Sequence, residues 1–503
     1  MYRSPGFGVE IYFTTNGIDA VDSSDSWGCD TADWRLRLNQ PNNVPDYVDE
    51  VAWAIDSAWS MEVVRFGFKA PYGIVSSVHQ SPNYKVIIEE MGGYYGLTYF
   101  AGLLDGDTTG TRSIVTIRNE WQGWDINEIV DYQSHPEKAI RITCAHEFFH
   151  AVQFSMVHSV IEDVYLDKFP ISWLEATATL MEELAFDYIN DYTQYLLEYF
   201  NKPAGFSFFS QNDDYDFYAN NILTLYLYHK SGRGIDFIKE IFESNYDTVS
   251  TISSLLEKAS VSAGTTWPEL LSKFHTESFY TGERADSGLF VPDSRIIDEL
   301  NYVKGECLIG LASTKNILPY GVQIFSALKP TGLNESFLQV RCTMEGAPEV
   351  KPVLKLMLTG GARDTIISSA DMHLNSLSII TDWGDHSEAI AVITNGSYDQ
   401  NITVSTLFSD ELLTTDNWRF SKGSPYVHPG IAIQKNAVVV PNGNCFVELY
   451  TLTGKRVYSE SVAGPAVFKL FEYNTISNGA YIAKVRWGRE TVEKIVMKRR
   501  GAL

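Results

Sequence analysis

The segment His146-Glu147-Phe148-Phe149-His150 restricts the fold of this chain more than any other stretch of the sequence. On a helix, His146 and His150 lie four residues apart on one face, where both imidazoles can bind one metal ion. A Zn²⁺ ion held by three protein ligands keeps its fourth position for a water molecule. The ion lowers the pKa of that water toward about 7. Glu147, one position around the helix, can hold that water, take its proton and pass it to a leaving amine. The pattern therefore predicts a helix that carries part of a zinc site.

A purely structural helix is the competing interpretation. Two histidines and a glutamate can fall at these offsets by accident, and the apolar flanking residues suit any core helix. However, burying two imidazoles and a carboxylate without a partner is costly, so an apolar core helix seldom contains all three. The metal site is the favoured interpretation.

The third ligand is predicted on the next helix. The metzincin pattern would place Gly and His further along the first helix, but Gln153 and Met156 occupy those positions. Glu175, in an apolar setting, supplies a carboxylate instead, and two histidines from one helix with a glutamate from a second form the gluzincin arrangement. A solvated acid near a helix start, favoured by the helix dipole, is the alternative for Glu175. Glu182 and Glu183 compete as ligands and are predicted to be a solvated end.

Three segments in this order resemble a family of secreted bacterial zinc metalloproteases. They are Val44–Glu50 (VPDYVDE), Ala145–Phe154 (AHEFFHAVQF) and Trp173–Glu182 (WLEATATLME). The resemblance covers about residues 8–280. It implies an α+β zincin-like (gluzincin) metallopeptidase domain.

Matched residue by residue, the resemblance implies zinc ligands His146, His150 and Glu175, with Glu147 as the general base. The chain departs from the pattern at Ala176, where such families commonly carry Gly after the ligand glutamate. On a helix this is a small change.

Other positions complete the expected site. Tyr218 is predicted to stabilise the oxyanion, although this chain has 28 tyrosines and the segment is also an aromatic packing face. Ser113–Arg118 is predicted to be the edge strand to which an extended peptide adds. His158 and His229 are predicted to be surface histidines.

The remaining pattern divides the chain into three parts: a metallopeptidase domain (1–285, helical from about 137), a β-sandwich accessory domain (286–425) and a small β-sandwich (426–503). In the first part the predicted strands are Val9–Phe13, Tyr84–Glu89 and Ser113–Arg118. One predicted helix there begins at Pro45-Asp46. Further helices are predicted over 138–158, 171–186, 191–200, 215–230, 235–244 and 266–274. Predicted strands of the second part include Leu338–Cys342, Val353–Leu358, Leu377–Thr381 and Ala389–Thr394, and a Ser/Gly/Pro-rich linker covers Phe420–Pro429.

The C-terminal part resembles the sorting domain of type IX secretion. The segments that carry the resemblance are Val447–Val457, Asn478–Val485 and Glu493–Lys498, and the tail Arg499–Leu503 runs past the usual lysine-rich end. The resemblance implies contact with an export machinery.

Composition limits the partners. With 39 basic and 63 acidic residues, the net charge of −24 argues against a nucleic-acid partner, and no apolar run is long enough for a transmembrane segment.

None of the five cysteines forms a CxxC pair, so a thiolate zinc site is not expected, and Cys307 and Cys342 are a candidate disulfide. The first residues do not form a signal peptide, but the protease site and the export-like tail predict a secreted or cell-surface protein.

The sequence thus predicts a secreted zinc-dependent endopeptidase that hydrolyses peptide bonds of a peptide or protein substrate through a Glu-activated, zinc-bound water. Two alternatives stay open. One is a non-catalytic surface adhesin or binding protein on a metallopeptidase fold, and the other is a zinc hydrolase of another amide or ester.

Overall fold

The structure is a computed structural model of the 503-residue chain. It describes residues 1–29, 33–72, 84–103, 111–122, 131–156, 170–209, 215–244, 251–286, 288–331, 337–345, 352–368, 376–410, 432–434, 437–451, 455–469, 479–487 and 490–498. The chain divides into two compact units, of which the first contains Met1–Asn334, Val340–Ile379 and Trp383–Phe408. The second consists mainly of Ser409–Leu503.

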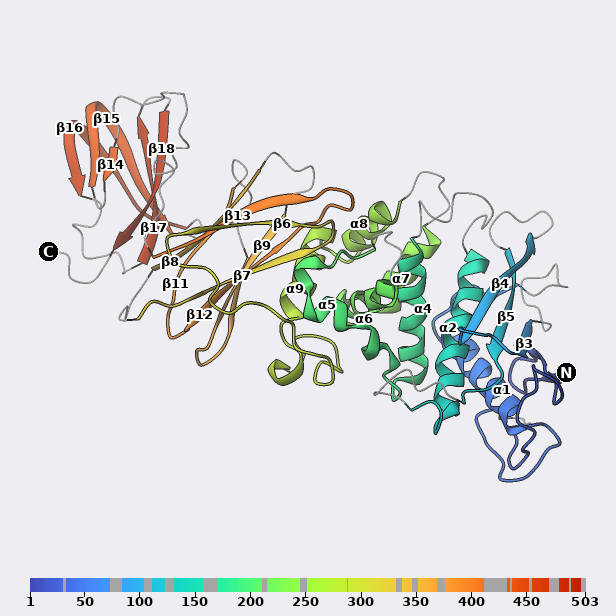
Figure 1. The fold of residues 1–503 in the computed structure, drawn as a ribbon. Coiled ribbons are helices and arrows are strands. Elements are labelled where there is room, and N and C mark those ends of the chain that lie inside the picture. The colour runs from blue at the N-terminus through green and yellow to red at the C-terminus, as the bar shows by residue number, and fades with distance from the viewer. Residues whose placement is uncertain are drawn as a thin grey trace. The chain divides into compact units, whose positions relative to one another are not determined.

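The N-terminal region of the first unit is a five-stranded mixed sheet covered by helices (Figure 1). The strand order is β1 (Tyr2–Arg3), β2 (Glu10–Tyr12), β3 (Lys85–Glu89), β5 (Thr111–Arg118), β4 (Gly96–Leu103). β2, β3 and β5 run parallel, whereas β4 pairs antiparallel with β5. Helix α1 (Asp46–Trp59) buries the apolar face predicted from its sequence, and it packs on α2 (Pro136–Met156), which in turn lies against β4 and β5.

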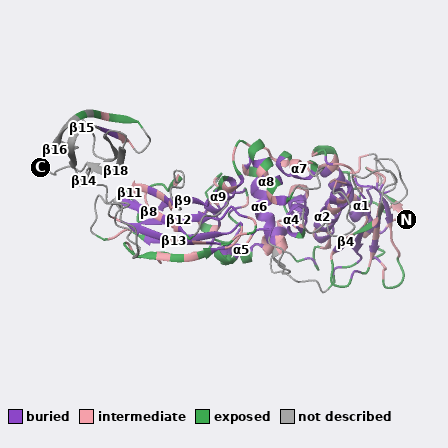
Figure 2. Ribbon diagram, turned by 90° about the horizontal axis from the view of Figure 1, so that it is seen from above, coloured by how far each residue is buried: buried purple, intermediate pink, exposed green. Residues whose placement is uncertain are grey.

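The helical region follows, and its longest members match the sequence pattern. α4 covers Ile171–Phe186 as predicted, and α2 and α4 pack along each other with mostly buried residues (Figure 2). The further helices are α6 (Asn221–Lys230), α7 (Ile235–Glu243), α8 (Ile252–Ser262) and α9 (Trp267–Glu277). α8 and the π-helical turn η1 (Ser60–Arg65), which continues α1, were not predicted.

Two predicted helices are each broken into shorter pieces. The predicted helix 191–200 is the 3₁₀ turn η2 (Asp191–Tyr195) followed by α5 (Leu197–Asn201), and 215–230 is the 3₁₀ turn η4 (Tyr215–Asn220) followed by α6. The Asn220 side chain accepts from the Phe209 backbone and donates to the Phe217 carbonyl. The bond to Phe217, three residues earlier, competes with helical hydrogen bonds and explains the break within 215–230. The short turns η3 (Pro203–Gly205) and η5 (Gly282–Arg284) complete the helical elements.

Two four-stranded antiparallel sheets, in a sandwich-like arrangement, form the rest of the first unit. Their strand orders are β10 (Thr365–Ser368), β9 (Val353–Thr359), β12 (Glu388–Thr394), β7 (Val322–Leu328), and β11 (Ser376–Asp382), β8 (Phe337–Met344), β13 (Ile402–Ser409), β6 (Ala312–Ile317). All the strands predicted here are present. α9 packs on β9 and β12, and one hydrophobic core joins the helices to this sheet. The boundary near 285 therefore separates a helical from a β region of one compact unit.

The second unit contains one five-stranded antiparallel sheet. Strands β14 (Ala432–Gln434), β15 (Ala437–Thr451), β17 (Gly479–Trp487) and β18 (Glu490–Lys498) lie in this order, and β16 (Arg456–Lys469) also pairs with β15. The segments whose residue pattern predicts strands here, Phe446–Tyr450, Arg456–Tyr458, Tyr481–Val485 and Glu493–Met497, lie in β15, β16, β17 and β18. The predicted linker Phe420–Pro429 lies outside the described residues.

Two further findings concern cysteines and hydropathy. Cys307 and Cys342 are both buried and free, as are Cys29 and Cys144, so the candidate disulfide is not formed. Among the described helices, none combines the length and apolar character needed to cross a membrane.

Candidate metal centre

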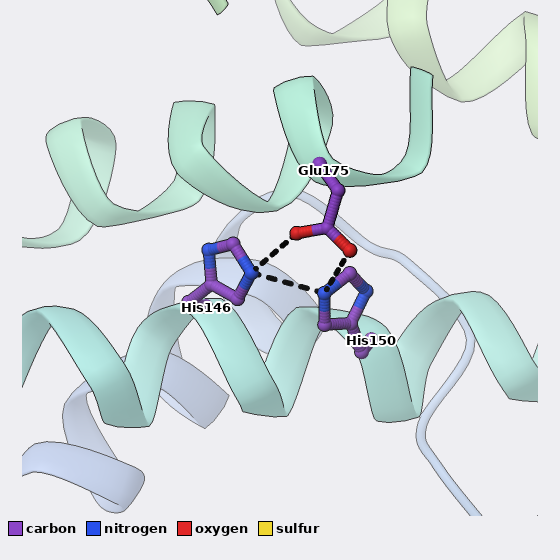
Figure 3. A group of neighbouring side chains, drawn as sticks. All are labelled: His146, His150 and Glu175. Atoms are coloured by element: carbon purple, nitrogen blue, oxygen red, sulfur yellow. Dashed lines mark hydrogen bonds and ion pairs between the residues drawn. The ribbon is translucent and has the colours of Figure 1, made fainter. Parts of the chain in front are cut away.

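Two packed helices bring the three predicted ligands together. His146 and His150 project from one face of α2, and Glu175 projects toward them from the first half of α4 (Figure 3). Their ligand atoms all lie within 4.8 Å of one another. The Nε2 atoms of the two histidines are 3.0 Å apart, and the Glu175 oxygens lie 3.0 Å from Nε2 of His146 and 3.5 Å from Nε2 of His150.

These separations fit a tetrahedral zinc ion. Two ligand atoms each about 2.1 Å from a tetrahedral Zn²⁺ lie about 3.4 Å apart. The observed separations of 3.0 to 3.5 Å come close to that value without rearrangement of either helix. Two imidazoles with one carboxylate are also a donor set typical of catalytic zinc.

Each imidazole is oriented by a hydrogen bond at its other nitrogen. Nδ1 of His146 donates to Glu182 Oε1 at 2.7 Å, which leaves Nε2 free to bind a metal. Nδ1 of His150 donates to Gln153 Oε1 at 2.8 Å. The Gln153 amide nitrogen in turn donates to the Leu174 carbonyl at 2.9 Å, so the orientation of His150 is tied to α4. Both rings are therefore held ready for one metal ion.

Electrostatics match this arrangement. Burial disfavours the charged form of His146, but hydrogen bonds to Glu175 and Glu182 outweigh it and raise its pKa well above the usual value. Burial also opposes ionisation of Glu175, yet the adjacent His150 and His146 hold its pKa well below the usual range. In the metal-free protein, the imidazole of His146 and the carboxylate of Glu175 thus stabilise each other's charged form.

Glu147 lies beside the three ligands, 7% exposed. Burial raises the pKa of its carboxyl group, and the two histidines act in the opposite direction. The Thr98 hydroxyl of β4 lies 2.8 Å from Glu147 Oε2, to which it can donate. β4 approaches α2 this closely because residue 96 is glycine: a Cβ there would lie 2.7 Å from Cγ of Glu147.

Replacing Gly96 by Ala is expected to push β4 away from α2. The added Cβ would also lie 2.7 Å from Thr143 Cγ2 and 2.9 Å from the Thr116 carbonyl, and overpacking of this kind costs about 1–3 kcal/mol. Thermal unfolding should show a lower melting temperature for Gly96→Ala. Gly93→Ala is the control, because nothing lies within 4 Å of its Cβ position; equal melting of the two variants would contradict the close approach.

Replacing Glu182 by Gln is expected to weaken zinc binding about 10- to 100-fold, because the second hydrogen-bonding shell sets the orientation and basicity of the ligand. The measurement is competition for Zn²⁺ against a chromophoric chelator. The matched control is Glu198→Gln, at an exposed acid of α5. Unchanged zinc affinity of Glu182→Gln would show that Glu182 does not support His146.

Tyr218 of η4 lies at the same site. Its ring centroid is 6.0 Å from that of His146, and the ring stacks on Tyr195 at 4.9 Å. Burial and the negative charges of Glu175 and Glu147 raise the pKa of Tyr218, so the phenol stays protonated and can donate a hydrogen bond. η4 packs on α4, which explains how this segment reaches the ligands.

Two of the predictions were wrong. Glu182 and Glu183 are not a solvated end: they are 7% and 6% exposed, because the α4 face that carries Glu175 continues into the interior. The edge strand is β4 rather than Ser113–Arg118, because β5 pairs with both β3 and β4. His229 is exposed as predicted. His158 lies outside the described residues.

The sequence interpretation missed the supporting residues Glu182, Gln153 and Thr98. Two of them had a signal in their spacing. Glu182 lies seven residues after Glu175, on the same helical face, and Gln153 lies three residues after His150. Thr98 had none, because β4 was not predicted.

The function of this chain is inferred from this geometry. No model of a known protein family matches the chain, and no curated protein matches it.

Proposed function

We propose that the chain is a zinc-dependent endopeptidase with a gluzincin-type fold, in which His146, His150 and Glu175 hold the metal. The observation that carries the proposal is the convergence of these three ligand atoms at zinc-like spacing beside the carboxylate of Glu147. Zn²⁺ bound there would supply a Lewis acid that lowers the pKa of water toward about 7. The residues around it perform the rest of the chemistry.

Glu147 is the general base. Its carboxylate takes a proton from the attacking water and passes it to the amine of the leaving peptide. Burial raises the pKa of Glu147, which makes its carboxylate a stronger base when ionised. The hydrogen bond from Thr98 holds the carboxylate in place.

The edge strand β4 favours a peptide over a smaller amide or ester. β4 ends its sheet, pairs only with β5 among the described strands, and contacts Glu147 through Thr98. An extended peptide can add to such an edge through backbone hydrogen bonds. That binding mode would bring a scissile bond next to Glu147.

Tyr218→Phe is expected to lower kcat about 10²- to 10³-fold with little change in KM. Loss of one oxyanion donor has an effect of this size, because the charge develops in the transition state. Phe keeps the ring that stacks on Tyr195, so zinc content should not change. Steady-state kinetics on a cleaved peptide provide the measurement, with Tyr228→Phe on the neighbouring helix α6 as control. Equal kcat in the two variants would show that Tyr218 does not stabilise the oxyanion.

Metal analysis combined with cleavage of a peptide library tests the proposed function. One zinc per chain together with cleaved peptide bonds supports it. Zinc without peptide cleavage, but with hydrolysis of other amides or esters, would favour the other hydrolase. A chain that binds no zinc would favour the non-catalytic binding protein.

We also propose that the protein acts outside the cell, exported through its C-terminal unit. Support comes from the strands of that unit, which include most of the residues that resemble a type IX sorting domain. Fusing residues 426–503 to a reporter in a bacterium with this secretion system tests the idea, and a reporter retained in the cell would contradict it.

A further inference from the structure

A second group of oxygen ligands lies at the C-terminal end of α4. Glu183 belongs to the last turn of this helix, Asp187 is its C-cap residue, and Asp293 follows η5 much later in the chain. One carboxylate oxygen from each lies within 4.8 Å of the others. None of the three belongs to the zinc centre.

Among the described residues, no basic side chain neutralises the charge of these three carboxyl groups through a salt bridge. Among the described residues, no Lys, Arg or His forms a salt bridge with any of them. His229 interacts electrostatically with Asp187, but partial burial of its ring and the charge of Lys230 lower the pKa of His229. Burial and the charges of Asp293 and Asp187 raise the pKa of Glu183 to about 9. Glu183 therefore keeps a proton at neutral pH, which it shares with Asp187 and Asp293, and no cationic side chain among the described residues takes the place of that proton.

The hydroxyl of Tyr192 in η2 points into the same cluster. Tyr192 is 1% exposed, and its hydroxyl makes no hydrogen bond of standard geometry with a described residue, although Asp293 lies within reach. Burial and the charges of Glu183, Asp293 and Asp187 raise the pKa of this phenol. A buried hydroxyl facing three carboxylates is a further oxygen donor that lacks a well-formed partner.

The segment that carries Asp293 is held firmly. Val291 and the preceding Phe290 are each 2% exposed. The backbone of Ser294 donates to the Val291 carbonyl at 3.2 Å, and Gly282 donates to the Ser294 carbonyl at 2.8 Å. Asp293 is therefore presented to α4 by a packed turn.

We propose that Glu183, Asp187 and Asp293, assisted by Tyr192, bind a Ca²⁺ ion. Hard oxygen donors without nitrogen or sulfur favour Ca²⁺, Mg²⁺ or Mn²⁺ over zinc. Ca²⁺ takes six to eight oxygens in a flexible geometry, whereas Mg²⁺ demands near-octahedral geometry. Asp187 is exposed, so water can complete the coordination. The ion would join the end of α4, the helix that carries Glu175, to η2 and to the 290–294 segment.

Calorimetric titration of the zinc-loaded full chain with CaCl₂, in zinc-buffered solution, tests this site. Wild type is expected to bind Ca²⁺ and to gain about 2–5 °C in melting temperature. Asp293→Asn and Asp187→Asn should each bind one Ca²⁺ fewer per chain and lose that gain. Asp187 is exposed, so its variant is not expected to disturb folding, which circular dichroism checks. The matched control is Asp298→Asn, an exposed acid of the same segment with the same charge change.

Three results would overturn the proposal. They are absence of Ca²⁺ binding by wild type, Ca²⁺ binding that is equal in wild type and both cluster variants, and equal affinity for Mg²⁺. This inference does not depend on the proposed peptidase function. Zinc content and peptide cleavage are measured separately, so the two proposals can fail independently.

Discussion

Glu147→Gln is expected to lower peptide cleavage about 10²- to 10⁴-fold while the protein keeps its zinc. The amide has nearly the size of the carboxylate but cannot accept the proton of the attacking water, and general base catalysis contributes a factor of this size. Zinc should remain because Glu147 does not belong to the converging ligand set of His146, His150 and Glu175. The measurements are kcat/KM on a peptide found in the library and metal content of the same sample.

The control for this variant is Glu137→Gln. Glu137 lies in the first turn of the same helix, α2, but its side chain is 36% exposed and far along the helix from the ligands. The same change of charge there should leave cleavage intact. A Glu147→Gln protein with bound zinc and full activity would rule out the base role.

Glu175→Ala is expected to lose zinc binding and, with it, activity. Structural zinc sites with four ligands bind with about 10–16 kcal/mol, or roughly 2.5–4 kcal/mol for each ligand, so removing one lowers affinity about 10²- to 10³-fold. The alanine also leaves the two imidazoles without the carboxylate that lies 3.0 Å from His146. Competition with a chelator measures the affinity, and peptide cleavage measures the consequence.

The control for this prediction is to remove the metal with a chelator and then to add Zn²⁺ again. Wild type stripped of metal should recover activity when Zn²⁺ is added, and Glu198→Ala, at an exposed acid of α5, should behave like wild type. Glu175→Ala should stay inactive at the same zinc concentration. If Glu175→Ala bound zinc as tightly as wild type, the third ligand would have to be another residue.

The local pattern of apolar residues in the sequence predicted the helices of the site better than the strands around it. α2 and α4 are long and apolar, and their bounds follow the sequence closely. β4 went unpredicted because Gly96 and Gly102 interrupt its alternation of residues. Gly96 is present because of a neighbour far away in the chain, since a Cβ would meet Glu147. A requirement of that kind does not appear in the periodicity of the strand itself.

The predicted helices 191–200 and 215–230 are each broken in the structure. Their composition suits helices, but within 215–230 the side-chain hydrogen bonds of Asn220 redirect the backbone. One consequence concerns both candidate sites: the 3₁₀ turn η4 holds Tyr218 beside His146, and η2 places Tyr192 at the acidic cluster.

By itself, the sequence determined the candidate ligands His146, His150 and Glu175 and the candidate base Glu147. It could do so because spacing along a helix settles which side chains share a face, and a buried carboxylate on the next helix needs a partner. Only the tertiary structure decided that Glu182 orients His146, that β4 is an edge strand among the described strands, and that Asp293 joins Glu183. Those relations depend on the packing of segments far apart in the chain, and neither composition nor periodicity records which segments meet.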